Sequence, residues 1–112
     1  MLSEIEIIDD VAVVAIEVDV LDASNTKEFK STIKPLLKEH PRMALDLSQV
    51  SFMDSSGLGA LLSCLRQLNS SGGDLKLYGV TPPVRALLEL VRMHKIVDIT
   101  NDREEAIKAF SA

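Results

Sequence analysis

Two neighbouring hydroxyl groups follow an aspartate in the segment Asp54-Ser55-Ser56-Gly57. An amphipathic run of leucines comes next, so Ser55 is expected beside the unpaired N–H groups that begin a helix. A phosphate group on Ser55 would meet the positive end of the helix dipole. On the local residues alone, a helix-capping hydroxyl is the commoner role for such a serine. The two roles are compatible, because phosphate oxygens can also accept hydrogen bonds from helix N–H groups.

The other residues with reactive side chains do not assemble into a catalytic set. Asp22 and Asp54 could form a pair of carboxylates, but the sequence near them holds no histidine or further acid to complete a mechanism. His40 and His94 are expected at helix ends, and Cys64 is expected to be a buried thiol without a redox role. Cysteine and histidine do not occur with the spacing of a zinc site. We therefore expect no catalytic residue, no metal ligand and no cofactor.

Gly57 and Gly59 lie at the expected start of the helix. The simplest role of a glycine there is tight packing of the helix against the preceding strand. In a binding protein, the same glycines would let a partner approach the backbone closely. They do not form a nucleotide-binding loop, because the lysine of a P-loop and the Gly-x-Gly-x-x-Gly spacing are both missing.

Composition indicates the size and class of the protein. The 112 residues are 46% hydrophobic, which suffices for one core, and we expect a single domain over residues 1–112. The net charge is −5 and there is no tryptophan, so nucleic acid is not expected as a partner. The amino terminus lacks a signal-peptide pattern, and charges interrupt each apolar stretch. With a single cysteine, the chain is expected to be a soluble cytoplasmic domain that does not bind a membrane.

The amino-terminal part of the chain predicts a hairpin followed by a helix. Residues 4–8 and 11–18 are apolar and β-branched, and the turn-forming pair Asp9-Asp10 separates them. Apolar residues at helical spacing predict a helix over residues 23–40, with Ser24 or Asn25 as its N-cap. Pro35 falls inside this helix, where it would remove a hydrogen bond at a cost of about 3 kcal/mol. We therefore expect a kink or a restart of the helix at this point.

The rest of the chain alternates strands with helices. Residues 43–47 suit a central strand that is buried on both faces. The next helix has Leu58 on its apolar face and ends at the turn signal of residues 70–73. A strand is expected at 74–80, followed by a helix that Thr81 caps and whose inward face carries Val84, Leu87, Leu88 and Val91. A strand is then expected at 96–99. The last helix is expected to begin at Asn101 or Asp102, where Asp102 and Glu105 form a capping box.

The predicted order of elements is ββαβαβαβα. Strands that are separated by helices of this length join by right-handed crossovers and lie parallel in one sheet. The opening hairpin adds an antiparallel pair. The sequence therefore predicts an α/β fold with a mixed, mostly parallel sheet covered by helices.

This order of elements accompanies a longer motif, Asp46-Leu47-Ser48 followed by Phe52-Met53-Asp54-Ser55-Ser56-Gly57-Leu58-Gly59. Together they resemble a STAS domain, and more narrowly the bacterial anti-sigma factor antagonists. The resemblance covers nearly the whole chain, including Leu21-Asp22 after the second strand and Gly72-Gly73 before the fourth.

The resemblance implies a phosphorylation-controlled switch of partners. In that family a serine kinase of the histidine-kinase-like ATPase fold, which is also the anti-sigma factor, phosphorylates the serine after the aspartate, here Ser55. Metal-dependent serine phosphatases reverse the modification. The domain is then a ligand and substrate, not an enzyme, and Ser56 is a structural residue or orients the kinase. The partner-binding residues implied are Asp22, Asp54, Ser55, Ser56, Gly57, Leu58 and Gly59.

A second function remains open at this point: a constitutive STAS accessory subunit of a transporter ATPase complex, which needs no phosphate cycle. The chain also departs from the family in two places. Many antagonists have Gly-Glu-Leu-Asp where this chain has Asp19-Val20-Leu21-Asp22, and Pro35 is unusual in the first helix. We therefore expect its choice of partner to differ.

Overall fold

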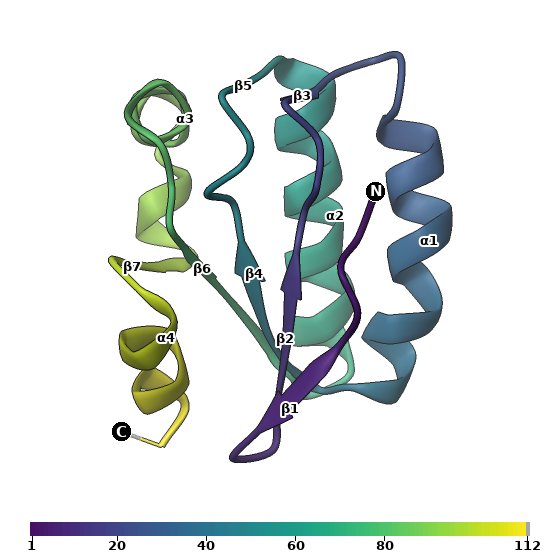
Figure 1. Cartoon of the computed structure of the whole chain (residues 1–112), viewed down its shortest axis with the longest axis vertical. Coiled ribbons are helices and arrows are strands. Elements are labelled where there is room, and N and C mark those ends of the chain that lie inside the picture. The colour runs from purple at the N-terminus through teal and green to yellow at the C-terminus, as the bar shows by residue number, and fades with distance from the viewer. Residues whose placement is uncertain (112) are drawn as a thin grey trace.

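A five-stranded sheet runs through the middle of the protein (Figure 1). The computed structural model describes residues 1–111. The strand order is β1-β2-β4-β6-β7, in which β1 is antiparallel to β2 and the other neighbours are parallel. The strands of this sheet are β1 (Glu6–Ile8), β2 (Val11–Ala15), β4 (Arg42–Asp46), β6 (Asp74–Tyr78) and β7 (Asp98–Thr100). A separate parallel pair joins β3 (Val20–Leu21) to β5 (Phe52–Met53).

Helices cover both faces of the sheet. The helices are α1 (Thr26–Glu39), α2 (Ser55–Ser70), α3 (Pro82–Leu90) and α4 (Arg103–Phe110), with a 3₁₀ turn η1 (Met93–Lys95). Helices α1 and α2 pack side by side over the larger core, to which α3 adds Val84 and Leu88 (Figure 1). Helix α4 covers a smaller core on the other face, around Tyr78 and Ala106. None of the helices within residues 1–111 has both the length and the apolar character to cross a membrane.

The predicted fold class and order of elements are confirmed. The hairpin turns at Asp9 and Asp10, whose φ values of 51° and 65° are those of a type I′ turn. Strand β4 is the middle strand of the sheet and is buried along most of its length, as expected. The small β3–β5 sheet was not predicted, because two residues per strand leave no alternating pattern in the sequence.

Of the kink or restart predicted at Pro35, the restart does not occur. Helix α1 runs as one helix from Thr26 to Glu39. The side chains of Phe29, Ile33 and Leu37 are buried in the larger core on both sides of the proline. Burial of each such side chain contributes about 1.5–3 kcal/mol, so together they outweigh the one hydrogen bond that proline removes.

The end of α3 differs from the prediction. Arg92 adopts the left-handed conformation with φ of 61°, so the chain leaves the helix after Leu90. Val91 was expected to face inward but is 50% exposed. Ile96 was expected in a strand, yet it follows η1 and is 58% exposed, and β7 begins only at Asp98. Tertiary packing therefore leaves two apolar side chains on the surface here.

Two of the predicted caps also use different atoms from those expected. Asp102 caps α4 by accepting a hydrogen bond from the Glu105 N–H at 2.9 Å, but the Glu105 carboxylate accepts from Asn101 instead of Asp102. The Thr81 hydroxyl donates to the Val50 carbonyl at 2.7 Å and does not cap α3. This bond ties the start of α3 to the loop between β4 and β5.

Candidate functional site

Asp54 is the N-cap of α2. Its Oδ1 atom accepts a hydrogen bond from the Gly57 N–H at 3.0 Å, which satisfies one of the unpaired donors of the helix. Its Oδ2 atom accepts from the Ala23 N–H at 3.3 Å. The carboxylate therefore holds the start of α2 and the loop after β3 together.

Ser55 is the first residue of α2 and is exposed. The interpretation of Ser55 as the capping hydroxyl is wrong, because the longer and charged side chain of Asp54 fills that role. Ser56 is half-buried. Of the two hydroxyl groups in the motif, that of Ser55 is the more accessible to another protein.

Asp22 lies in the loop that Asp54 contacts. Its Oδ1 atom accepts hydrogen bonds from the Ser24 hydroxyl at 2.5 Å and from the Ser24 N–H at 3.0 Å, and these bonds lower the pKa of Asp22 below its usual value. The Asn25 side chain holds the loop by accepting from the Asp22 N–H and donating to the Val20 carbonyl. Asn25, one of the two residues expected as the N-cap of α1, does occupy that position, but its side chain fixes this loop and makes no capping hydrogen bond to the helix.

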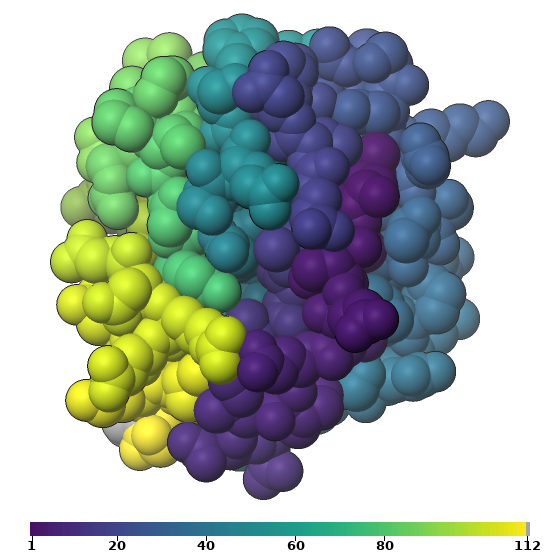
Figure 2. Space-filling view, viewed as in Figure 1, coloured from purple at the N-terminus to yellow at the C-terminus, as the bar shows by residue number. Residues whose placement is uncertain are grey.

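The β3–β5 pair brings the two segments of the site together. Leu21 lies opposite Met53, and the Asp54 N–H donates to the Leu21 carbonyl at 3.4 Å. Figure 2 shows the same juxtaposition on the surface, where residues near 20 (indigo) and near 52 (teal) are neighbours at the top. The structure thus brings together the predicted site residues from both halves of the chain.

The two glycines of the motif have different surroundings. A Cβ atom on Gly57 would lie 2.5 Å from the Leu21 carbonyl oxygen and 2.9 Å from the Met53 Cβ, so glycine is needed for α2 to pack on the β3–β5 pair. The packing role predicted for Gly57 is confirmed. For Gly59 the same prediction is wrong, because a Cβ atom there would meet nothing within 4 Å.

A shallow apolar groove of about 270 Å³ adjoins Ser55 between α2 and the end of α3. Leu58, which was a predicted partner-binding residue, is largely buried and forms part of this groove together with Gly59. The remaining lining residues are Leu62, Val91, Met93 and Ile96. Sequence reasoning missed the last three, although two adjacent apolar residues at the end of a predicted helix, Leu90 and Val91, could have indicated a surface.

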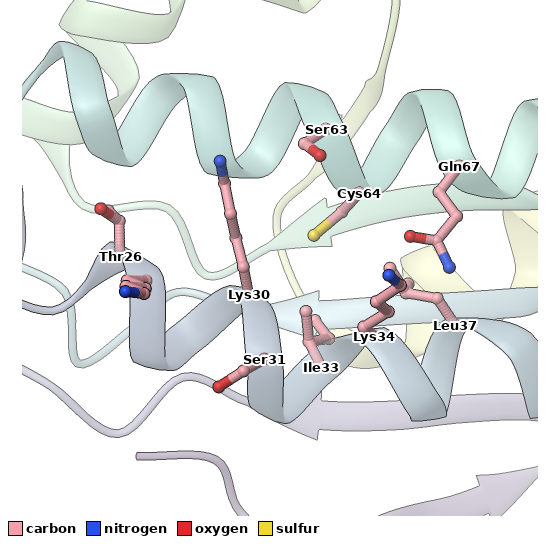
Figure 3. A pocket seen from close by; sticks show the side chains of 10 residues that line it. Thr26, Lys30, Ser31, Ile33, Lys34, Leu37, Ser63, Cys64 and Gln67 are labelled. Atoms are coloured by element: carbon pink, nitrogen blue, oxygen red, sulfur yellow. The ribbon is translucent and has the colours of Figure 1, made fainter.

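A second groove lies between α1 and α2 and contains none of the predicted partner-binding residues. Figure 3 shows Lys30 of α1 reaching across toward α2, with the sulfur of Cys64 between the two helices. Cys64 is only 2% exposed, and burial raises the pKa of its thiol to about 12. The thiol is therefore protonated at neutral pH and serves as a small apolar side chain, as expected.

The histidines lie at helix ends, as predicted. His40 is the C-cap of α1, and His94 lies in η1. Within residues 1–111, His, Cys, Asp and Glu side chains form no group of three or more that could hold a metal ion.

Comparison with known proteins indicates one family. An anti-sigma-B factor antagonist from Listeria monocytogenes is 32% identical over 88 residues, which cover 79% of this chain and 75% of that protein. An anti-sigma F factor antagonist from Paenibacillus polymyxa is 37% identical over 65 residues, 58% of this chain, and the match spans only 56% of that protein. The crystal structure of an anti-sigma factor antagonist candidate from Thermotoga maritima has a TM-score of 0.85 at 29% identity, covering 97% of this chain and 94% of that one.

The family model of the STAS domain matches residues 3–106. This range runs from β1 into the first turn of α4 and includes Asp54 and Ser55. The mostly parallel sheet with helices on both faces is the fold that the sequence resemblance implied. Because the model matches nearly the whole chain and the fold agrees with it, this chain belongs to the STAS domain family.

Proposed function

We propose that this chain is a phosphorylation-controlled partner-switching regulator of the anti-sigma factor antagonist type. The unphosphorylated form binds an anti-sigma factor that is also a serine kinase of the histidine-kinase-like ATPase fold. Phosphorylation of Ser55 releases the chain from the kinase, and a metal-dependent serine phosphatase restores the form that binds. The observation that carries the proposal is the exposed Ser55 hydroxyl at the start of α2, with Asp54 already serving as the cap.

The chemistry of the transfer needs only an accessible hydroxyl on this chain. The Ser55 oxygen forms a bond to the γ-phosphorus of ATP as the bond to the bridging oxygen of ADP breaks, and the hydroxyl proton leaves to a base on the kinase. Ser56 is less suitable, because it is half-buried. The chain acts as substrate and ligand, and the catalytic groups belong to its partner.

A phosphate on Ser55 would change the surface charge without unfolding the domain. It adds about −1.5 to −2 charges at neutral pH, next to the carboxylate of Asp54. Asp22 lies across the same site, and its lowered pKa keeps it ionised, so the patch becomes strongly negative. The helix N-terminus offers the anion roughly 0.3–1 kcal/mol, which favours the folded phosphoprotein.

The same charge is sufficient to end a protein–protein contact. A hundredfold loss of affinity corresponds to about 2.7 kcal/mol. An unpaired charge that is buried at an interface costs about 2–5 kcal/mol. The proposed switch therefore needs no rearrangement of the fold.

The test uses the cognate kinase, which is to be sought as a histidine-kinase-like ATPase among the genes that neighbour this one. Incubation of the chain with this kinase and ATP, followed by mass spectrometry, should place one phosphate on Ser55 and leave Ser56 unmodified. Ser55→Ala should bind the kinase normally and accept no phosphate. Ser55→Asp should bind at least about a hundredfold more weakly in calorimetry.

Two results would contradict the proposal. One is kinase binding that Ser55→Asp leaves unchanged. The other is a stable complex with a transporter ATPase that is indifferent to Ser55→Asp, which would identify the chain as a constitutive accessory subunit. The variant Ser70→Ala is the matched control, because it removes an exposed hydroxyl at the other end of α2 and should keep both phosphorylation and binding.

A further inference from the structure

Apolar side chains gather on the surface at the end of α3. Among residues 1–111, five large apolar residues are exposed, and three of them lie here: Leu90 at 78%, Val91 at 50% and Ile96 at 58%. The left-handed conformation of Arg92 creates the cluster, because it ends the helix and turns the chain before Met93. Exposed apolar groups that are adjacent to one another commonly mark an interaction surface.

The cluster continues into the groove beside Ser55. Leu58 and Leu62 of α2 lie on one side of the groove, and Val91, Met93 and Ile96 lie on the other. Its volume of about 270 Å³ is below the roughly 300–1,000 Å³ of typical small-molecule pockets. The groove is therefore better suited to apolar side chains of a protein than to a separate ligand.

Cationic residues border the groove. Arg92 and Lys95 are exposed on the segment that forms one wall, and the exposed His94 lies between them in the chain. Arg66 follows Leu62 by one turn on the same face of α2 and is also exposed. None of these four residues takes part in the ion pairs found among residues 1–111.

The nearest acids along the chain are already paired. Glu89 lies 4.0 Å from the guanidinium of Arg85, and Asp98 lies 2.7 Å from the buried ammonium of Lys76. In a chain with a net charge of −5, the wall that follows α3 is thus locally positive, while the carboxylate of Asp54 lies next to Ser55 at the other side of the groove. An apolar groove with a cationic border complements a segment that has apolar side chains flanked by acids.

We propose that this groove, formed by Leu58, Leu62, Val91, Met93 and Ile96, binds an amphipathic, acid-flanked segment of the partner kinase. The inference rests on the proposed function, because it assigns the affinity of the same complex to a surface that Ser55 borders. Phosphorylation would then place a dianion at the edge of the groove. It would repel the acids of the bound segment and compete with them for the cationic border.

The experiment compares two isoleucines of similar exposure. Ile96→Asp places a charge in the groove, whereas Ile7→Asp changes an isoleucine that is 54% exposed on β1, at the other end of the molecule (Figure 1). Calorimetry with the kinase should show binding at least about a hundredfold weaker for Ile96→Asp and unchanged for Ile7→Asp. Circular dichroism checks that both variants are folded.

A charge reversal at an exposed position provides a second variant that does not depend on apolar packing. Lys95→Glu should weaken kinase binding by about tenfold, and the loss should shrink as the salt concentration rises. Lys27→Glu, on the exposed face of α1, is its control and should bind normally.

The outcomes separate this inference from the switch. If Ile96→Asp and Lys95→Glu bind normally while Ser55→Asp does not, the groove inference is overturned and the switch stands. If Ile96→Asp abolishes binding while Ser55→Asp binds normally, the groove stands and the switch is overturned. An equal loss for Ile7→Asp, or a dimer of the free chain that Ile96→Asp dissociates in ultracentrifugation, would overturn the inference.

Discussion

At the scale of single residues, one carboxylate organises the proposed switch. Asp54 accepts hydrogen bonds from Gly57 within its own helix turn and from Ala23, which is 31 residues earlier in the chain. Because this side chain supplies the cap, the hydroxyl of Ser55 is not needed for the stability of α2. A residue that is exposed and not required for folding can be modified without loss of the domain.

Cys64 provides a prediction at the same scale. Burial raises the pKa of its thiol to about 12, so at pH 8 only about one thiol in 10⁴ is ionised in the folded protein. Unfolding returns the pKa to about 8.5, at which roughly a quarter is ionised at pH 8. Iodoacetamide should therefore label Cys64 much faster in urea than in the native chain. Mass spectrometry after equal reaction times should show the unfolded chain labelled and the native chain unlabelled.

The same shift has a consequence for stability. Because the folded thiol ionises less readily than the unfolded one, stability should decrease as the pH rises from about 8.5 toward 12. Cys64→Ala, which has no titrating group, should lack this part of the decrease. Rapid labelling of the native protein at pH 8 would show that the thiol is accessible and contradict its burial.

At the scale of elements, the start of α2 depends on its contact with the β3–β5 pair. Two short strands, each of two residues, bring Leu21 and Met53 against the first turn of the helix. Gly57 fits this contact and Gly59, two residues later, faces open space. The two glycines of one motif should therefore respond oppositely to the same substitution.

Gly57→Ala should lower the free energy of unfolding by roughly 1–3 kcal/mol, because the added methyl group meets a backbone oxygen and the Cβ of Met53. Gly59→Ala should raise it by up to about 1 kcal/mol, since alanine favours the helix more than glycine. Urea unfolding followed by circular dichroism measures both values. A change of the same sign in both variants would contradict the packing described here.

At the scale of the whole molecule, two cores lie on opposite faces of one sheet. Most buried side chains lie between the sheet and α1 and α2, while Tyr78 and Ala106 belong to the smaller core under α4. Both cores share the strands β2, β4 and β6, whose alternate side chains point to opposite faces. We therefore propose that the chain folds as one domain.

Cooperative unfolding tests this proposal with two probes. Tyr78 is the only tyrosine, there is no tryptophan, and it lies in the smaller core, so its fluorescence reports the α4 face. Circular dichroism mainly reports α1 and α2, the two longest helices. The two urea transitions should coincide at one midpoint. An earlier transition of the Tyr78 signal would instead indicate that the α4 face unfolds separately.

The sequence by itself determined the elements and the place of the motif among them. The paired aspartates of the hairpin, the glycine with φ of 84° at position 72 that follows α2, and the apolar periodicities all act between neighbouring residues. These predictions are confirmed except at the end of α3, where Val91 is exposed and the strand begins later than expected. Where Asp54-Ser55-Ser56-Gly57 falls relative to a strand and a helix could be predicted for the same reason.

The tertiary structure alone decided which residues of the motif cap the helix, which pack against the β3–β5 pair and which lie on the surface. It made Asp54 the cap instead of Ser55, brought the loop of Asp22 to the start of α2, and gave Gly57 and Gly59 opposite surroundings. It also left Val91 and Ile96 on the surface beside Ser55. Periodicity depends on residues a few positions apart, whereas burial and exposure depend on segments that meet only after the chain has folded.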